Sequence, residues 1–190
     1  MLKAYCNQKN KVWYCIILND RGEVEACQFS LKSMGDAFKT ASKNVFEKKE
    51  KIQLFKNIPP TIKPLLEVLA DIFEGKTPKK TVKISMDKLP KFTREVLEVV
   101  KKVPKGFVST YGVVAKAVGK PKASRAVGNV MAKNPFPLLV PCHRVVKSNL
   151  SLGNYRNGKT IKKMLLEKEG VKIHKTKKGY TIDKKFVYHF

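Results

Sequence analysis

The chain has 190 residues, 43% of them hydrophobic, which is enough for one large domain or two small ones with packed cores. Forty Lys and Arg residues against fifteen Asp and Glu give a formal net charge of +25, which favours a polyanionic partner such as nucleic acid. A compositional bias or a hot environment would also produce a Lys-rich surface. No apolar run approaches the roughly 18 residues of a transmembrane helix, and the N-terminus lacks a signal-peptide pattern. We therefore expect no membrane contact and a cytoplasmic location, or a nuclear one in a eukaryote.

The N-terminal part is predicted to form a small sheet followed by a helix. Apolar residues dominate 12–18, and Asn-Asp-Arg-Gly at 19–22 is a plausible hairpin turn before a strand over 24–29. From Ile62 to Phe73 the apolar residues recur at helical spacing, and Gly75 ends that helix. Residues 76–90 are mostly polar and contain two prolines, Pro78 and Pro90. We therefore predict a sheet-and-helix domain over residues 1–85.

The next part is predicted to be mostly helical. One helix is expected over 93–103, followed by two short helices over 111–118 and 124–133. Gly-Lys-Pro-Lys at 119–122 joins the short pair, which is the pattern of a helix-turn-helix. Many short helix pairs bind nothing, and the small side chains of the second helix equally suit tight helix packing. With Arg125 near the start of that helix and a charge of +25, contact with nucleic acid competes with packing.

The last part is predicted to combine a strand, a helix and a basic tail. Leu138–Val140 has the pattern of a short buried strand, and a helix is expected over 160–169 with Gly170 as its cap. The tail over 171–190 is Lys-rich and could form a hairpin that turns at 177–179. The prediction is thus an α/β (α+β) fold with domains at 1–85 and 86–170 and a tail at 171–190.

Three of the four cysteines lie in the first thirty residues. Cys6, Cys15 and Cys27 lack CxxC spacing, and no histidine precedes His143, so we predict no structural zinc and no other metal. A pairing of Cys6 with Cys27 would require the first and third strands to be neighbours, which the sequence leaves open.

The fourth cysteine is the best candidate for chemistry. Cys142 stands directly beside His143 in Pro-Cys-His-Arg-Val, and a neighbouring base can convert a thiol into the reactive thiolate. A lone cysteine after an apolar strand is more often buried and inert. Adjacent side chains on a strand point to opposite faces, so a bridging water or a tight turn would have to connect this pair.

Glu169 is the second candidate. A carboxylate in the last turn of a helix opposes the helix dipole. Either Lys162, Lys163 or Lys168 neutralises it, or it faces His143 and stabilises an imidazolium as the acid of a triad does. Spacing alone leaves both readings open.

Several motifs together resemble the O6-alkylguanine-DNA alkyltransferases. The resemblance covers about 80 residues, from Phe92 to Gly170, in the family's order and approximate spacing. Its motifs are Phe92–Leu97, Thr110-Tyr111, Ser124–Gly128, Asn134-Pro135, Pro141–Val145, Gly153–Tyr155 and Leu165–Gly170.

The resemblance implies a role for each site residue. Cys142 would accept the alkyl group, His143 would deprotonate it through a water, and Glu169 would hold the histidine. Asn134 would brace the turn that presents the cysteine, and Tyr111 would give a proton to the departing guanine. Arg125 would fill the gap left by the flipped base. Residues implied in DNA binding are Ala123, Ser124, Gly128, Thr93 and Thr110, and residues implied in the base pocket are Tyr155, Arg156, Asn157, Val145, Met131 and Pro137.

The implied function is repair of alkylated duplex DNA in one irreversible turnover. The substrate would be O6-alkylguanine, with O4-alkylthymine as a second candidate, and binding would use the minor groove and base flipping. The protein would act as a monomer without a cofactor. Tyr155-Arg156-Asn157-Gly158 is bulkier than the Ser and Gly frequent in relatives, which places acceptance of large adducts such as benzyl in question. The alternatives are a non-catalytic lesion-recognition protein, which Cys142 argues against, and a helix-turn-helix regulator, for which an Ala- and Gly-rich helix is poorly equipped.

Overall fold

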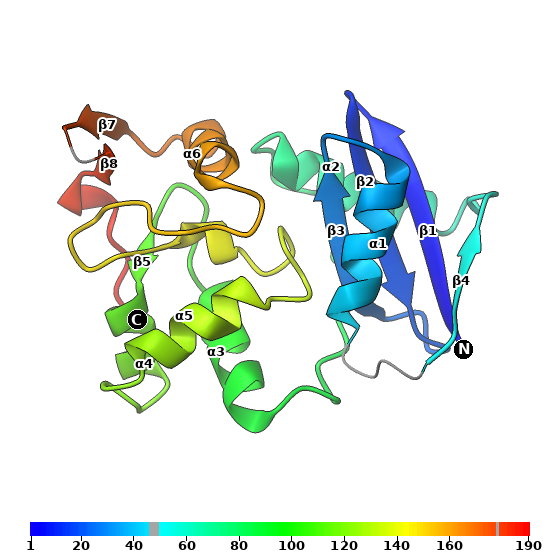
Figure 1. Ribbon diagram of the computed structural model, residues 1–190, viewed down its shortest axis with the longest axis horizontal. Coiled ribbons are helices and arrows are strands. Elements are labelled where there is room, and N and C mark those ends of the chain that lie inside the picture. The colour runs from blue at the N-terminus through cyan, green and yellow to red at the C-terminus, as the bar shows by residue number, and fades with distance from the viewer. Residues whose placement is uncertain (46–49, 178) are drawn as a thin grey trace. The chain divides into compact units, whose positions relative to one another are not determined.

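A computed structural model describes residues 1–45, 50–177 and 179–190 (Figure 1). The chain forms two compact units, which are described separately. Unit 1 comprises Met1–Leu89 together with Pro135–Leu139, and unit 2 comprises Pro90–Asn134 and Val140–Phe190. The domain limits at residues 85 and 170 stay predictions.

Unit 1 is built on a four-stranded sheet, as the sequence pattern predicts for the first thirty residues. The sheet has the order β3-β2-β1-β4, in which β4 runs parallel to β1 and the other pairs are antiparallel. The hairpin turn at 19–22 is confirmed, and Gly22 supplies the positive φ of 74° there. The elements of the unit are β1 (Leu2–Lys9), β2 (Val12–Leu18), β3 (Val24–Ser30), α1 (Met34–Asn44), β4 (Ile52–Phe55) and α2 (Lys63–Phe73).

Two helices explain why β2 is apolar on both faces. Cys15 and Ile17 point toward α1, which packs against β1, β2 and β3 and contributes Ala37 and Ala41. On the other face, Tyr14 and Phe29 make edge contacts with Phe73 of α2. The predicted helix up to Phe73 is thus confirmed, whereas α1 and β4 were not predicted.

The pairing of Cys6 with Cys27 does not occur. β2 lies between β1 and β3, so these two cysteines are not on neighbouring strands. All four cysteines are buried, and none of them forms a disulfide. The Cys27 thiol instead donates to the carbonyl of Pro137 at 3.3 Å, within unit 1.

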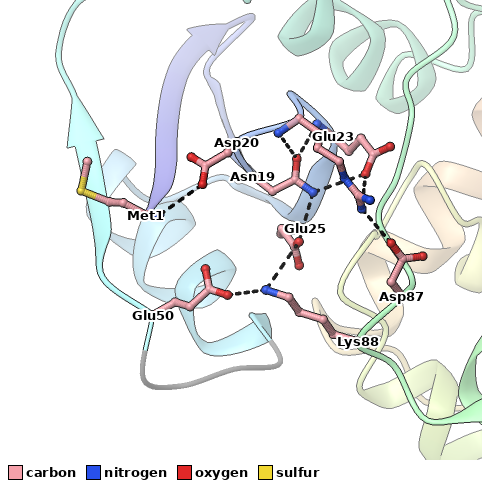
Figure 2. Close-up of polar contacts among 9 residues, drawn as sticks. Met1, Asn19, Asp20, Glu23, Glu25, Glu50, Asp87 and Lys88 are labelled. Carbon is pink, nitrogen blue, oxygen red and sulfur yellow. Dashed lines mark hydrogen bonds and ion pairs between the residues drawn. The ribbon is translucent and has the colours of Figure 1, made fainter.

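The polar segment after α2 is fixed to the turn between β2 and β3. The Val24 amide donates to the Lys83 carbonyl, and the Ser85 amide donates to the Val24 carbonyl. Ion pairs also join Arg21 to Asp87 and Lys88 to Glu50 (Figure 2). The Arg21–Asp87 pair is exposed and contributes at most about 1 kcal/mol, whereas Lys88 and Glu50 are partly buried. The acidic side chains that gather here are Asp20, Glu23, Glu25, Glu50 and Asp87, one third of the fifteen in the chain.

Unit 2 is mostly helical. Helices α3, α4 and α5 pack on one another, and the two helices predicted to form a helix-turn-helix are α4 and α5. The elements of the unit are α3 (Lys91–Lys101), β5 (Ser109–Thr110), α4 (Tyr111–Ala117), α5 (Ser124–Ala132), β6 (Val145–Val146), α6 (Lys159–Lys168), β7 (Ile173–Thr176) and β8 (Gly179–Ile182). The α/β fold class, with a sheet-and-helix part followed by a mostly helical part, is confirmed.

The predicted strand over 138–140 is wrong. Leu138 has a φ of 75°, which turns the backbone instead of extending it, and Pro135–Leu139 groups with unit 1. The cysteine therefore follows a turn.

The tail is an ordered part of unit 2. β7 and β8 form the antiparallel hairpin that the sequence suggests, although its turn includes Lys178, which lies outside the described residues. Ile182 joins a core with Val108, Val146 and Leu166. Val108 also pairs with the backbone of residues 186 and 188, so the C-terminal residues hold the strand that leads into Tyr111.

Candidate active site

A pocket of about 680 Å³ opens beside α5 within unit 2. Cys142 lies at its wall with 5% of its surface exposed. The pocket brings together seven of the residues singled out in the sequence, namely Cys142, Tyr111, Arg125, Gly128, Met131, Tyr155 and Arg156. Asn129, Ala132, Lys147 and Asn154 complete its lining.

The backbone before Cys142 forms a very tight turn. Pro141 has φ −78° and ψ 63°, and the Cys142 amide donates to the Val140 carbonyl at 2.8 Å. These values are those of an inverse γ-turn, for which the proline ring fixes a suitable φ. A short 3₁₀ helix over Cys142–Arg144 follows. Cys142 and His143 are therefore not consecutive residues of an extended strand. Strand geometry does not force their side chains to opposite faces.

His143, Glu169 and Arg144 form a buried charged cluster behind the cysteine. His143 is fully buried, and its Nε2 lies 2.9 Å from Oε1 of Glu169. Arg144 donates to both oxygens of the same carboxylate, at 2.9 and 2.7 Å, and to the Val103 carbonyl at 2.7 Å. Of the two readings of Glu169, contact with His143 is the one the geometry supports, since Lys162 and Lys163 have other partners.

The charge state of this cluster determines the histidine tautomer. Burial alone would raise the pKa of Glu169, but hydrogen bonds from His143 and Arg144 and their charges lower that pKa to about 2. Burial lowers the pKa of His143 despite the opposing effect of Glu169. The ionised carboxylate only accepts, so neutral His143 carries its proton on Nε2. Its Nδ1, which has no hydrogen-bond partner among the described residues, is left as the basic nitrogen.

Opposing effects act on the Cys142 thiol. Burial raises the pKa of Cys142, whereas a hydrogen bond with Asn134 and the charges of Lys162 and Arg156 lower it. Lys162 is itself fully buried on α6, and its ammonium donates to the Val145 carbonyl at 2.5 Å. No carboxylate lies within ion-pair distance of Lys162 in the described parts of the chain. Deprotonated Cys142 is thus the anion that would compensate this buried cation.

Tyr111 is placed to keep its phenol proton. Burial, followed by the neighbouring Cys142, raises the pKa of Tyr111. A Cβ on Gly153 would come within 3.3 Å of the phenol oxygen, and the φ of Gly153 is 70°. Both constraints favour glycine at this position, close beside the phenol.

The implied DNA-binding residues divide into two sets. Ser124, Arg125 and Gly128 line an open groove that adjoins the pocket and also includes Ser148 and Asn149. Thr110 is the N-cap of α4, where its hydroxyl accepts from the Val113 amide at 3.2 Å. Ala123 immediately precedes α5, and Thr93 lies in the first turn of α3.

The remaining implied pocket residues are not part of the pocket lining. Val145 is fully buried and contributes its carbonyl to Lys162. Asn157 lies in the loop before α6 and is partly buried. Pro137 belongs to unit 1.

Sequence reasoning missed Arg144, Lys147 and Lys162. Lys162 had a detectable signal, because it stands three and four residues before the buried Leu165 and Leu166 and therefore on the inner stripe of the helix. Arg144 had none beyond its place next to His143, since only the fold brings it to Glu169.

Carboxylates are scarce around the pocket. No Asp or Glu occurs between Glu98 and Glu167, and this stretch supplies every residue that lines the pocket and the groove.

Within the described residues, no group of three His, Cys, Asp or Glu could hold a metal ion. None of the helices described is long and apolar enough to cross a bilayer.

Asn134 joins the two ends of the loop that precedes the cysteine. Its amide donates to the Val140 carbonyl at 3.0 Å in a buried position. Replacing Asn134 with Ala is expected to lower the free energy of unfolding by about 1 kcal/mol, because the buried Val140 carbonyl would lose one of its two donors and keep only the Cys142 amide. The pKa of Cys142 is expected to rise as well. Urea unfolding and the pH dependence of thiol alkylation measure both effects, and a variant with unchanged values of both would contradict this account. Asn57→Ala, at an exposed position of unit 1 that does not line the pocket, is the control.

Comparison with known proteins agrees with this geometry. Residues 91–171 match the family described as 6-O-methylguanine DNA methyltransferase, DNA binding domain. The chain is 47% identical over 79 residues to the methylated-DNA–protein-cysteine methyltransferase of Methanosarcina acetivorans, covering 42% of this chain and 51% of that one. It is 49% identical over 85 residues to the human protein of that name, covering 44% of this chain and 41% of that one. The chain thus spans about half or less of the length of these curated relatives.

A solved structure extends the match to most of the chain. The O6-methylguanine-DNA methyltransferase of the hyperthermophilic archaeon Pyrococcus kodakaraensis superposes with a TM-score of 0.69 at 30% identity. The match covers 90% of this chain and 100% of that one, so it includes both units. On this evidence, the chain belongs to the O6-methylguanine-DNA methyltransferase family.

Proposed function

We propose that the protein repairs duplex DNA by transferring an alkyl group from O6 of guanine to Cys142. The observation that carries the proposal is the placement of Cys142 at the wall of a pocket, backed by His143 and the ionised Glu169. A thiolate can displace guanine from a methyl carbon without a metal, because guanine is a stabilised leaving group. The resulting thioether is not readily hydrolysed, so each chain acts once.

The surrounding residues have distinct roles in this proposal. Nδ1 of His143 takes the thiol proton through a water, and Glu169 holds the ring in the required tautomer. The S–C bond forms as the C–O bond breaks, and Tyr111 protonates the departing guanine. The phenol is suited to this step because its raised pKa keeps it protonated.

A flipped base would reach the pocket from the groove. Arg125 lies at the exposed start of α5 and borders both the groove and the pocket, so it can take the place of the extruded base. Gly128 leaves room for a DNA backbone, as expected for a helix that enters the minor groove. Asn134 keeps the cysteine turn closed, and Met131 and Tyr155 contact the base. Thr110, Thr93 and Ala123 support these helices, and O4-alkylthymine remains a second candidate substrate.

Intact-protein mass spectrometry tests the proposal. After incubation with duplex DNA containing O6-methylguanine, the protein should gain the mass of one CH2 group on the Cys142 peptide, with one equivalent per chain. Cys142→Ala should bind the same DNA and gain no mass. Repeated turnover, or transfer by Cys142→Ala, would rule the mechanism out. Binding of the lesion without any mass gain by the unaltered protein would instead favour a recognition protein.

A further inference from the structure

The pocket beside Cys142 carries an excess of positive charge. Three cationic side chains line it, Arg125, Lys147 and Arg156, and none of its lining residues is acidic. The buried ammonium of Lys162 adds a fourth charge close enough to affect the thiol. These charges favour the thiolate whatever the adduct, but an uncharged alkyl group such as methyl forms no ionic contact of its own with them.

Arg156 is the cation most firmly held near the reacting sulfur. Its Nε and Nη2 both donate to the Ala132 carbonyl, at 2.9 and 2.5 Å, which fixes the guanidinium against the C-terminal end of α5. Partial burial lowers the pKa of Arg156, while the charge of Cys142 raises it. Arg156 and Cys142 thus line the same pocket and lie within electrostatic reach of each other.

We propose that Arg156 makes this pocket selective for O6 adducts that carry a negative charge, of which O6-carboxymethylguanine is the simplest. The inference rests on the proposed alkyl transfer and specifies its substrate class. An anionic adduct would otherwise be repelled by the thiolate that attacks it, and Arg156 offsets this repulsion. Because the guanidinium is fixed before substrate binds, little reorganisation is needed.

The chemical step keeps the charges balanced. The Cys142 thiolate attacks the methylene carbon of the O6–CH2–COO⁻ group and forms the S–C bond. The C–O bond breaks, its electron pair moves to guanine, and guanine takes a proton from Tyr111. The proton that His143 took from the thiol returns to the Tyr111 phenolate through water. The products are S-carboxymethylcysteine and unmodified guanine, and no further reactant is required.

The test compares two adducts of nearly equal shape that differ in charge. Duplexes containing O6-carboxymethylguanine or the neutral O6-carbamoylmethylguanine are mixed with the protein, and single-turnover rate constants are measured for each by mass spectrometry. The ratio of the two rate constants cancels differences in DNA binding. In Arg156→Gln this ratio is expected to fall by about tenfold, as removal of one partly screened charge predicts. Because the two leaving groups differ in intrinsic reactivity, the change in the ratio is the deciding quantity.

Two further variants separate charge from shape. Arg156→Lys keeps the charge but loses the paired bonds to Ala132, and should retain most of the ratio. Lys159→Gln removes an exposed charge outside the pocket and should leave the ratio unchanged. In the unaltered protein, raising the salt concentration should lower the ratio.

The outcomes distinguish this inference from the proposed function. If the unaltered protein fails to demethylate O6-methylguanine, the proposed function is wrong. If it does so and Arg156→Gln has an unchanged ratio, charge selection by Arg156 is wrong. Should Arg156→Gln react with neither adduct, the salt dependence of the ratio in the unaltered protein and in Arg156→Lys decides, and a ratio that salt changes in neither protein would overturn the inference.

Discussion

Replacing Glu169 with Gln is expected to lower the free energy of unfolding at pH 7 by about 3 kcal/mol. The carboxylate is buried and ionised, and it is the shared acceptor for His143 and both donor groups of Arg144. Its pKa falls from an ordinary 4.5 to about 2 in the folded protein. A shift of that size corresponds to about 3 kcal/mol of stabilisation by the charged form.

The sign of this shift fixes the pH dependence. A carboxylate with a lowered pKa stabilises the fold fully above about pH 4.5, and this contribution is lost as the pH falls from 4.5 toward 2. The difference in stability between the unaltered protein and Glu169→Gln should therefore shrink over that range. Urea unfolding at several pH values measures it.

The neighbouring Glu167 provides the matched control. It lies on the exposed face of α6 and pairs with Lys163 at 2.6 Å. Glu167→Gln should change stability by no more than about 1 kcal/mol. Alkyl transfer by Glu169→Gln should fall by about 100-fold, because the amide can present either an oxygen or an NH2 group to His143 and no longer fixes its tautomer. Equal effects of the two substitutions would contradict the assigned role of Glu169.

The sequence allowed the helical part of the site to be predicted well. Periodic apolar residues located α3 and α6, the turn at 119–122 located α4 and α5, and the motif around Cys142 indicated the candidate thiol. The positions of Tyr111 and Arg125 in one pocket with Cys142 also follow the expectation. These features depend on local patterns, such as helical spacing and short motifs.

The parts that were missed depend on distant contacts. Leu138 adopts a positive φ that its apolar sequence does not signal, so a turn was taken for a strand. The two donors of Arg144 find Glu169 only once the end of α6 packs beside the cysteine turn. Helix α1 escaped prediction because its buried face consists of alanines and is weakly apolar.

Lys162, which the sequence pattern alone does not connect with Cys142, is a buried cation that lowers the pKa of the thiol. Burial lowers the pKa of Lys162 itself to about 8 from an ordinary 10.5, so the folded state bears an unfavourable charge below about pH 8. Lys162→Met is therefore expected to increase the free energy of unfolding at pH 7 by up to about 3 kcal/mol. That gain should shrink as the pH rises from 8 to 10.5. Over this range Lys162 is neutral in the folded protein, and the free energy needed to deprotonate it in the unfolded chain falls toward zero.

The same substitution should impair the thiol. Without the ammonium, the pKa of Cys142 rises further, and the midpoint of its reaction with iodoacetamide should move to higher pH. Transfer at pH 7 should slow by about tenfold, since fewer molecules carry the thiolate. Lys163→Met removes an equal charge from the partly exposed neighbouring position and should change neither property much. A more stable protein with a slower cysteine would mean that the buried charge of Lys162 is retained for reactivity. A variant with unchanged thiol titration would show that Lys162 only supports the carbonyl of Val145.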